Sequence, residues 1–411
     1  INDNPITTDL NFFGRMFSAP PTLREYNNDG EFIATVGNYA DGNMAAQIDK
    51  FYRRDETYKT TLGTSLKIDF TKKLYLKLNA IWYITNNEQE FFNKRFLKSP
   101  GVYDETRKAS VSYTRSLNQT YNAILGYKNS IGKNNINAVA GFEFIDKYKF
   151  YFAASGQDAT SDDFINLQYT NAIVNVAGGE TTRSMSTTHT QERIMSSFIN
   201  ANYDYDSRYL VSFSGRLDGY SRLVNNKFGF FPGISFGWNI NREEFMSEYN
   251  DIIDNLKLRV GYGQNGNVNL LSGIYDLLGN YANPGNYKGE YGFLINKLPY
   301  PDLRWEKTTS FDIGTDFAFL DKIRGSLGVY NKLTTDLLAT VSFPTSAGVG
   351  TMLTNNGSVR TRGFEGEVKY KIVETKDFTW EAGINLTYQR SKIISLPDNG
   401  NTNNRQGGQQ V

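Results

Sequence analysis

The run Leu74-Tyr75-Leu76-Lys77-Leu78-Asn79-Ala80-Ile81-Trp82-Tyr83-Ile84 decides the fold class of this chain. Its even positions are apolar, whereas most of the odd positions between them are polar or amphipathic. Because consecutive side chains of a β-strand point to opposite faces, this alternation predicts a strand with one apolar face. A similar run begins at Tyr58, and Thr71-Lys72-Lys73 separates the two. Residues 58–84 therefore predict a β-hairpin with one apolar side.

The same construction recurs along the chain as pairs of alternating runs. The further pairs are 111–127 with 136–152, 193–203 with 209–217, 228–240 with 256–262, 310–319 with 326–333, and 364–372 with 378–388. Residues 242–246, inside the connection of the third of these pairs, are expected to form a short helical turn. Six hairpins predict twelve antiparallel strands, and the predicted class is all-β.

The composition supports this class and excludes several functions. The chain has 28 Phe, 27 Tyr and 37 Gly but 10 Pro, a mixture that favours strands and close bends. Its mean hydropathy is −0.49, and no apolar run approaches the roughly 18 residues of a spanning helix, so a helical membrane protein is excluded. A net charge of +1 produces no strong positive potential that would attract nucleic acid. Without cysteine, the chain has no disulfides, thiolate metal sites or thiol nucleophiles.

The connections between hairpins differ from the turns inside them. Residues 86–108, 155–192, 264–308 and 339–361 are long and rich in Gly, Asn, Thr and Ser. A transmembrane β-barrel of the bacterial outer membrane has this asymmetry, with short periplasmic turns and long extracellular loops. We therefore predict that residues 1–411 are part of one antiparallel barrel domain. Its strands are expected between 57 and 390, and residues 1–56 and 391–411 are expected to be outer loop segments.

The last predicted hairpin shows the two faces of such a wall. Phe364, Val368 and Ile372 would meet outer-membrane lipid, whereas Glu365 and Lys369 would face an aqueous lumen. Two other interpretations remain open at this point: a passive porin, and a secreted β-sandwich that binds glycans.

Several segments in the second half of the chain resemble the barrel of SusC/RagA-type TonB-dependent transporters, and their order matches too. They are Arg216–Arg222, Phe228–Trp238, Glu244-Phe245, Leu256–Asn267, Pro301–Thr308, Asp336-Leu337-Leu338 and Asn355–Glu365. The first half matches this family in character more than in motif. The resemblance implies a barrel of about 22 strands around an N-terminal plug, of which the twelve here would be the middle and later part. The chain begins at Ile1 without the pattern of a signal peptide, and residues 409–411 stand in a polar stretch that no strand closes. Both ends are therefore expected to be cuts within a longer protein.

The resemblance also implies a function and partners. Members of the family import oligosaccharides or peptides, usually with a SusD-like surface lipoprotein over the outer mouth. TonB supplies the energy through the plug, which has no counterpart in these residues. No enzyme activity and no cofactor are expected.

Candidate substrate contacts fall into two groups. The first consists of polar residues expected on the lumen side near the outer ends of strands, namely Arg216, Asp218, Arg259, Asp312, Glu365 and Gln389. The second consists of loop aromatics that would stack on sugar rings or pack against the lipoprotein, namely Tyr281, Tyr287, Tyr291 and Trp305. For any single polar residue, pairing with its neighbours or with the plug is the simpler role.

Four other motifs are better explained by structure than by chemistry. Gly261–Gly266 fits the dinucleotide pattern G-x-G-x-x-G, but no amphipathic helix follows it. His189, the only histidine, is expected at a polar loop edge rather than in a catalytic triad. The carboxylate pairs Glu243-Glu244 and Glu365 with Glu367 are expected to be solvated rather than hydrolytic. Asp398–Asn404 is rich in oxygen ligands but lacks the spacing of a calcium loop, so no metal site is predicted.

Overall fold

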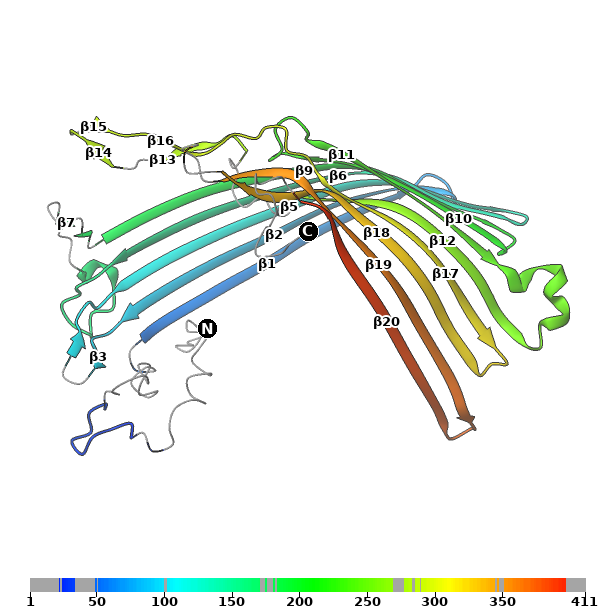
Figure 1. Cartoon of the computed structure of the whole chain (residues 1–411), viewed down its shortest axis with the longest axis horizontal. Helices are drawn as coiled ribbons and strands as arrows, with labels where there is room; N and C mark the ends of the chain where they lie inside the picture. The colour runs from blue at the N-terminus through cyan, green and yellow to red at the C-terminus, as the bar shows by residue number, and fades with distance from the viewer. Residues whose placement is uncertain are drawn as a thin grey trace. The chain divides into compact units, whose positions relative to one another are not determined.

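The computed structural model shows an all-β protein (Figure 1). It describes residues 22, 24–33, 49, 51–99, 102–170, 174–175, 180–181, 183–268, 277–282, 285–288, 290–343, 346 and 351–396. The main sheet has twelve strands in the order β1-β2-β5-β6-β9-β10-β11-β12-β17-β18-β19-β20. The all-β class and the predicted twelve strands are confirmed.

The strands of the main sheet are β1 (Phe51–Asp69), β2 (Leu74–Asn93), β5 (Ala109–Ile131), β6 (Asn134–Gly156), β9 (Arg183–Tyr205), β10 (Tyr209–Tyr220), β11 (Phe228–Asn239), β12 (Ile253–Asn267), β17 (Glu306–Phe319), β18 (Ile323–Ser342), β19 (Thr351–Glu374) and β20 (Thr379–Ser395). Four small ribbons pair β3 (Phe96–Ser99) with β4 (Val102–Asp104), β7 (Val174–Asn175) with β8 (Glu180–Thr181), β13 (Asn280–Ala282) with β16 (Leu294–Lys297), and β14 (Asn286–Tyr287) with β15 (Glu290–Tyr291). The short 3-10 helices are η1 (Leu167–Tyr169), η2 (Ile240–Arg242) and η3 (Glu244–Tyr249). The last two confirm the helical turn expected at 242–246. Within the described residues, no helix has the length and apolar character needed to cross a membrane.

The predicted strand boundaries were too narrow at the long-loop end. β1 begins at Phe51 rather than after residue 56, and β20 continues to Ser395. Likewise β9 begins at Arg183, inside a segment that was expected to be a loop. The alternation of apolar residues stops earlier than the strands do, because a backbone ladder in water needs hydrogen-bond partners but no apolar face.

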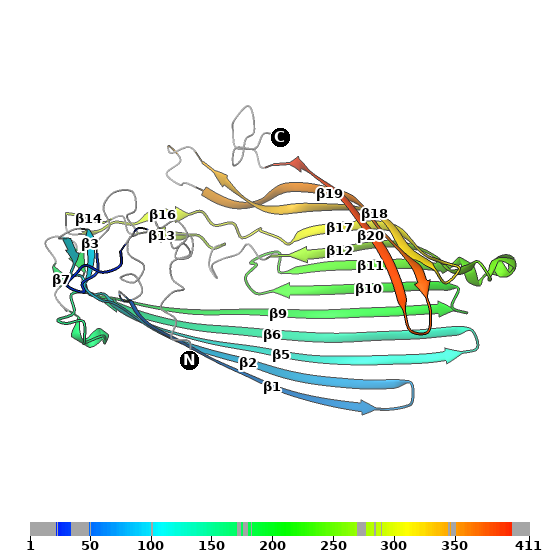
Figure 2. The ribbon, with the colours of Figure 1, turned by 90° about the horizontal axis from the view of Figure 1, so that it is seen from below.

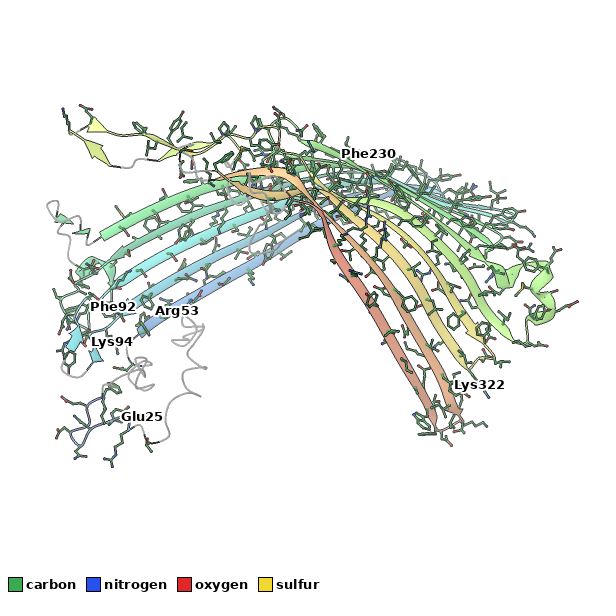
Figure 3. All side chains as sticks on the ribbon, viewed as in Figure 1. Glu25, Arg53, Phe92, Lys94, Phe230 and Lys322 are labelled. Atoms are coloured by element: carbon green, nitrogen blue, oxygen red, sulfur yellow. The ribbon has the colours of Figure 1, made fainter. Side chains whose placement is uncertain are left out.

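The chain divides into two compact units. Unit 1 comprises Ile1–Gly63, Ile81–Gln119 and Lys147–Gln191, and unit 2 comprises Thr64–Ala80, Thr120–Asp146 and Glu192–Val411. Unit 1 has a small core of Phe92, Ala109 and Ala159. Figure 3 labels Phe92. Beside it, the Arg95 guanidinium lies 3.7 Å from the centre of the Tyr103 ring.

In unit 2, antiparallel register fixes which side chains share a face. Phe364 lies opposite Tyr388 and Val368 lies opposite Ile384, whereas Glu365 lies opposite Thr387 and Glu367 opposite Asn385. Figures 1 and 2 show β17, β18 and β19 side by side. We call the side that carries Glu365 the polar face and the side that carries Phe364 the outward face.

The outward face carries an exposed apolar band. On β19 and β20 the band covers residues 364–372 and 380–388, and Val368, Ile384 and Leu386 within it are exposed. A tilted strand needs about 9–11 residues to cross a bilayer, so the band has the height of a membrane. Arg362 and Arg390 lie opposite each other directly beyond its loop end. The band therefore ends where charge begins.

A buried cluster closes the polar face at the loop end of unit 2. We call it the rim cluster, and its buried members are Tyr220, Leu223, Phe231, Leu277, Leu303, Trp305 and Leu338. It gathers residues from three strands and from the connections before β11 and β17. Its packing fixes these connections against the sheet.

Candidate functional site

The register places all six predicted polar residues on the polar face of unit 2. Arg216 and Asp218 lie on β10, Arg259 on β12, Asp312 on β17, Glu365 on β19 and Gln389 on β20. The prediction that they lie near the outer ends of their strands is only partly right. Arg216 and Asp218 lie near the loop end of their strand, but Arg259, Asp312 and Glu365 lie near the middle of theirs. Alternation gives the face of a residue, whereas its height depends on where the hydrogen-bonded strand ends.

Five of these six side chains stand opposite a glycine. Asp218 faces Gly229, Arg259 faces Gly237 and Gly314, Asp312 faces Gly261, Glu365 faces Gly328, and Gln389 faces Gly363. At Gly261 an added Cβ would lie 2.6 Å from Asp312 Oδ1, and at Gly314 it would lie 3.1 Å from Arg259 Nη2. These two polar side chains therefore lie across bare backbone, which a Cβ would obstruct.

Arg216 is the centre of a charged network. Its Nε donates to Asp218 Oδ1 at 2.7 Å, and its Nη2 donates to Glu143 Oε1 at 3.0 Å and to Ser196 Oγ at 2.9 Å. Glu143 comes from β6 and Ser196 from β9, so three neighbouring strands meet here. Three of its N–H donors are thus engaged by protein acceptors, and a ligand that binds one of these same donors would have to replace that acceptor.

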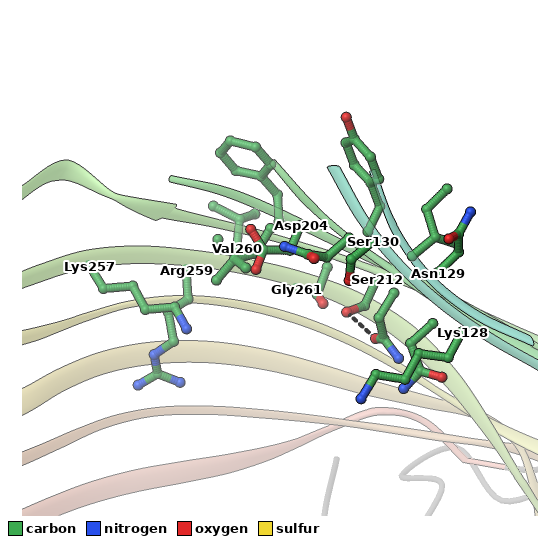
Figure 4. A pocket seen from close by; sticks show the side chains of 18 of the residues that line it. Lys128, Asn129, Ser130, Asp204, Ser212, Lys257, Arg259, Val260 and Gly261 are labelled. Atoms are coloured by element: carbon green, nitrogen blue, oxygen red, sulfur yellow. Dashed lines mark hydrogen bonds between the residues drawn. The ribbon is translucent and has the colours of Figure 1, made fainter. Parts of the chain in front are cut away.

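A hollow of about 770 Å³ lies on unit 2 nearer the short turns. Lys128, Lys257 and Arg259 contribute cations, and Figure 4 shows these three residues around it. Asp312 also borders the hollow, and Arg259 Nε lies 3.1 Å from Asp316 Oδ2. The lining thus offers charges of both signs together with amides and hydroxyls, a set that binds polar solutes through hydrogen bonds.

Several residues of this hollow were missed by the sequence analysis. They are Lys128, Asn202, Ser212, Ser235 and Lys257. Ser212 Oγ donates to Asn202 Oδ1 at 2.7 Å, which ties β10 to β9. Asn202, Ser212, Ser235 and Lys257 occupy polar positions of the predicted alternating runs, and Lys128 directly follows one, so the alternation predicts the face on which they lie.

Trp305 corrects the expectation of an open loop aromatic. Its side chain is only 7% exposed, and its indole N–H donates to the Lys227 carbonyl at 3.1 Å. The ring packs edge-on against Phe231, with centroids 5.5 Å apart. It is enclosed by the rim cluster and cannot stack on a ligand. Tyr281 is 71% exposed on β13, and the side chains of Tyr287 and Tyr291 lie outside the described residues.

Three of the motifs that carried the resemblance, around Arg304, Asp336 and Asn355, meet beside the rim cluster. Arg304 Nη2 donates to Asp336 Oδ1 at 2.6 Å, and the Arg304 backbone N–H donates to Asn355 Oδ1 at 2.8 Å. Asn355 Nδ2 returns hydrogen bonds to the carbonyls of Arg304 and Asp336. The buried Glu306 accepts from the Leu338 backbone N–H at 2.7 Å. These segments are therefore scaffolding for the loop connections.

Carboxylates at the short turns are bound by neighbouring groups. Glu243 accepts from the Trp238 indole at 2.9 Å and lies 3.5 Å from Arg208 Nη1. Hydrogen bonds from Tyr209 and Trp238 lower the pKa of Glu243 below its ordinary value. Similarly, a hydrogen bond from Lys133 lowers the pKa of Asp206 in the β9–β10 turn. These groups fasten the turns.

The structure also places the other motifs that the sequence analysis considered. Gly261–Gly266 lies inside β12, and the strand runs through the motif. The Nδ1 atom of His189 lies 3.1 Å from the Tyr148 hydroxyl in unit 1. Glu367 forms an ion pair with Lys369. No group of three or more potential metal ligands occurs in the part of the chain that the structure describes, and Asp398–Asn404 lies outside that part.

Comparison with known proteins gives one family. A family model described as "TonB dependent receptor-like, beta-barrel" matches residues 2–410. TonB-dependent receptor P3 of Formosa agariphila is 27% identical over 387 residues, which cover 92% of this chain and 37% of the relative. TonB-dependent receptor SusC of Bacteroides thetaiotaomicron is 31% identical over 287 residues, which cover 68% of this chain and 27% of the relative.

The fold has a close structural counterpart. The solved structure of the RagAB peptide transporter superposes with a TM-score of 0.78 at 22% identity, covering 90% of this chain and 41% of that one. The chain thus spans well under half the length of the relatives that it matches.

Proposed function

Because the chain belongs to the TonB dependent receptor-like β-barrel family, and is of its SusC/RagA type, we propose that the whole protein imports an oligosaccharide or a peptide. The family consists of receptors and transporters of the outer membrane, and the twelve-stranded sheet is part of a barrel wall. A secreted β-sandwich is thereby excluded.

The observation that carries the proposal is the contrast between the two faces of unit 2. An apolar band of bilayer height covers one face, and charged and amide side chains with a large hollow cover the other. A wall with these faces separates lipid from an aqueous interior in which a polar solute travels. The hollow that includes Arg259 and Asp312 is the proposed contact for that solute.

The proposed partners follow from the family type. A SusD-like surface lipoprotein covers the outer mouth, and TonB acts through a plug region elsewhere in the whole protein. The likeness to a peptide transporter supports a peptide as the cargo. Oligosaccharide is the second cargo to be tested, because hydroxyl and amide groups suit both.

Uptake by cells that carry the whole protein tests this function. Labelled oligopeptides and oligosaccharides are supplied to wild-type cells, to cells without TonB, and to cells with Arg259→Gln and Asp312→Asn together. We expect uptake of one cargo class, its loss without TonB, and a reduction of about tenfold in the double variant, as expected when a binding group is lost.

A matched control is Thr315→Ser, which changes the outward face of the same strand as Asp312. It should leave uptake unchanged. Uptake that persists without TonB would identify a passive porin instead, and equal uptake by the double variant would remove the hollow from the proposed path.

A further inference from the structure

The connection between β11 and β12 differs from the other turns at its end of the sheet. The other hairpins of the main sheet close there with tight turns, such as residues 206–208 between β9 and β10. Residues 240–252 instead contain η2 and η3, and they project beyond the strand ends at the right of Figure 1. We call residues 240–252 the foot. Because short connections mark the periplasmic side of an outer-membrane barrel, the foot lies on that side.

The foot carries an apolar stripe. Met246, Tyr249 and Ile252 recur at a spacing of three residues, and side chains with this spacing eclipse one another in a 3-10 helix. The Ile252 N–H donates to the Tyr249 carbonyl at 2.9 Å, so the helical spacing continues to the end of the foot. The side chains of Tyr249 and Ile252 are each half exposed. Within the described residues, the stripe is therefore not fully covered.

The other two sides of the foot carry polar groups. Glu244, Ser247 and Asn250 share one side and are all exposed. The third side is mixed, because the exposed Phe245 and Glu248 share it. The foot is thus amphipathic, with an apolar stripe that is one side chain wide.

The start of the foot is tied to the outward face of the wall. Gly237 lies opposite Arg259 on the polar face, so its neighbour Trp238 lies on the outward face. Tyr209 lies opposite Trp238 on the same face. The Trp238 indole donates to Glu243 Oε1 at 2.9 Å, and the Tyr209 hydroxyl donates to the same carboxylate. Two outward aromatic residues therefore hold the first turn of the foot.

The end of the foot also joins the outward face. The Leu320 N–H donates to the Ile252 carbonyl at 2.9 Å, and the Leu320 side chain is 53% exposed. Leu320 directly follows Phe319, which stacks on Phe317 with ring centroids 5.6 Å apart. Both rings lie on the outward face, because they alternate with Asp316 on the polar face. The apolar surface of the outward face thus continues onto the foot.

This continuity indicates what covers the stripe. The outward face of the wall meets lipid, and the stripe extends that surface at its periplasmic end. A stable protein interface buries about 800 Å² on each partner, for which a stripe one side chain wide is narrow. Amphipathic helical segments instead bury such a face among lipid headgroups. Tyrosine suits this level, since its ring is apolar and its hydroxyl reaches water.

We propose that the foot lies in the surface of the periplasmic leaflet, with Met246, Tyr249 and Ile252 among the phospholipid headgroups and Glu244 and Asn250 in water. The inference rests on the outer-membrane location and is independent of the transported cargo.

Spin labels in the whole protein test this placement. The protein is reconstituted in vesicles of phosphatidylethanolamine and phosphatidylglycerol, and one nitroxide is attached to Tyr249→Cys or to Ile252→Cys. The chain contains no cysteine, and any cysteine in the rest of the whole protein is first replaced by serine. Collisions with oxygen, which dissolves in the bilayer, are compared with collisions with a water-soluble nickel chelate present on both sides of the membrane. We expect both labels to lie about 5–10 Å below the phosphate level.

Matched controls come from the polar side of the foot. Labels at Glu244→Cys and Asn250→Cys should collide mainly with the nickel chelate. In the Tyr249→Cys protein, adding Ile252→Asp should raise the label to the phosphate level or above, because a charge is not tolerated among acyl chains. Adding Asn250→Asp instead should leave the depth of the label unchanged. Heat-dependent mobility on a gel verifies that each barrel is folded.

Two results would overturn the proposal. If the labels of the stripe collide with the nickel chelate as often as the control labels do, the foot stands in water. If the labels of the stripe are shielded from both oxygen and the chelate, a protein surface covers them instead of lipid.

Discussion

The polar and outward faces of unit 2 are built from alternate residues of the same strands, yet they manage charge in opposite ways. On the polar face Arg216 is bound by Asp218 and Glu143, and Arg259 by Asp316. On the outward face the band is apolar, and Arg362 and Arg390 at its border have no acidic partner within the described residues. Water on one side tolerates an internally balanced network, whereas lipid on the other side excludes charge up to the headgroup level.

The difference shows where a ligand has to compete with protein groups for a hydrogen-bond donor. A solute in the lumen that binds the Arg216 donors engaged by Asp218 or Glu143 must replace these protein acceptors. The four changes below test this contrast, beginning with the largest expected effect.

Trp305→Ala should cost about 3–5 kcal/mol of unfolding free energy, because it empties the centre of the rim cluster. Urea titration of the whole protein in lipid vesicles measures this. Tyr281→Ala removes an exposed aromatic and should change stability by less than about 0.5 kcal/mol. Equal effects of the two changes would mean that the loop end of the polar face is not closed by packing.

Val368→Arg should cost about 2–4 kcal/mol, because it places a charge within the apolar band. Asn385→Arg is the matched control on the polar face of the neighbouring strand, where it faces Glu367. Its effect should remain within about 0.5 kcal/mol in the same titration. If the order of the two effects were reversed, the faces would be wrongly assigned.

Gly261→Ala should cost about 1 kcal/mol, because its Cβ meets the Asp312 carboxylate. Adding Asp312→Ala should recover most of that loss. Gly263→Ala, with nothing within 4 Å of its Cβ, serves as the control and should be nearly neutral. A loss that persists in the double variant would show that backbone, rather than Asp312, resists the methyl group.

Glu243→Gln should give the smallest effect, and this effect should depend on pH. The pKa of Glu243 lies below its ordinary value of 4.5, so its carboxylate stabilises the fold at neutral pH. That contribution is present above about pH 4.5 and is lost as the pH falls through the lowered pKa. Thermal melting of both proteins from pH 7 to pH 3 should therefore converge at the acid end. A constant difference across this range would assign the stability to something other than the ionised carboxylate.

The alternation in the sequence was sufficient for the class, the strand count and the faces. Glu365 and Phe364 lie on opposite faces as predicted, because a period of two is a property of any strand. The turn at 242–246 was also predictable, since its polar residues interrupt the alternation. The resemblance carried by Arg304 and Asn355 gave the family, although both residues serve the loop connections.

The tertiary structure alone decided how these residues meet. Arg216 and Glu143 are 73 positions apart in sequence and join because β6, β9 and β10 are neighbours in the sheet. Register also set Asp312 over Gly261 and buried Trp305 beneath the rim, which no local pattern encodes. The sequence by itself determined the side of the wall on which each residue lies. Partners and burial required the assembled sheet, because both depend on contacts between strands that are distant along the chain.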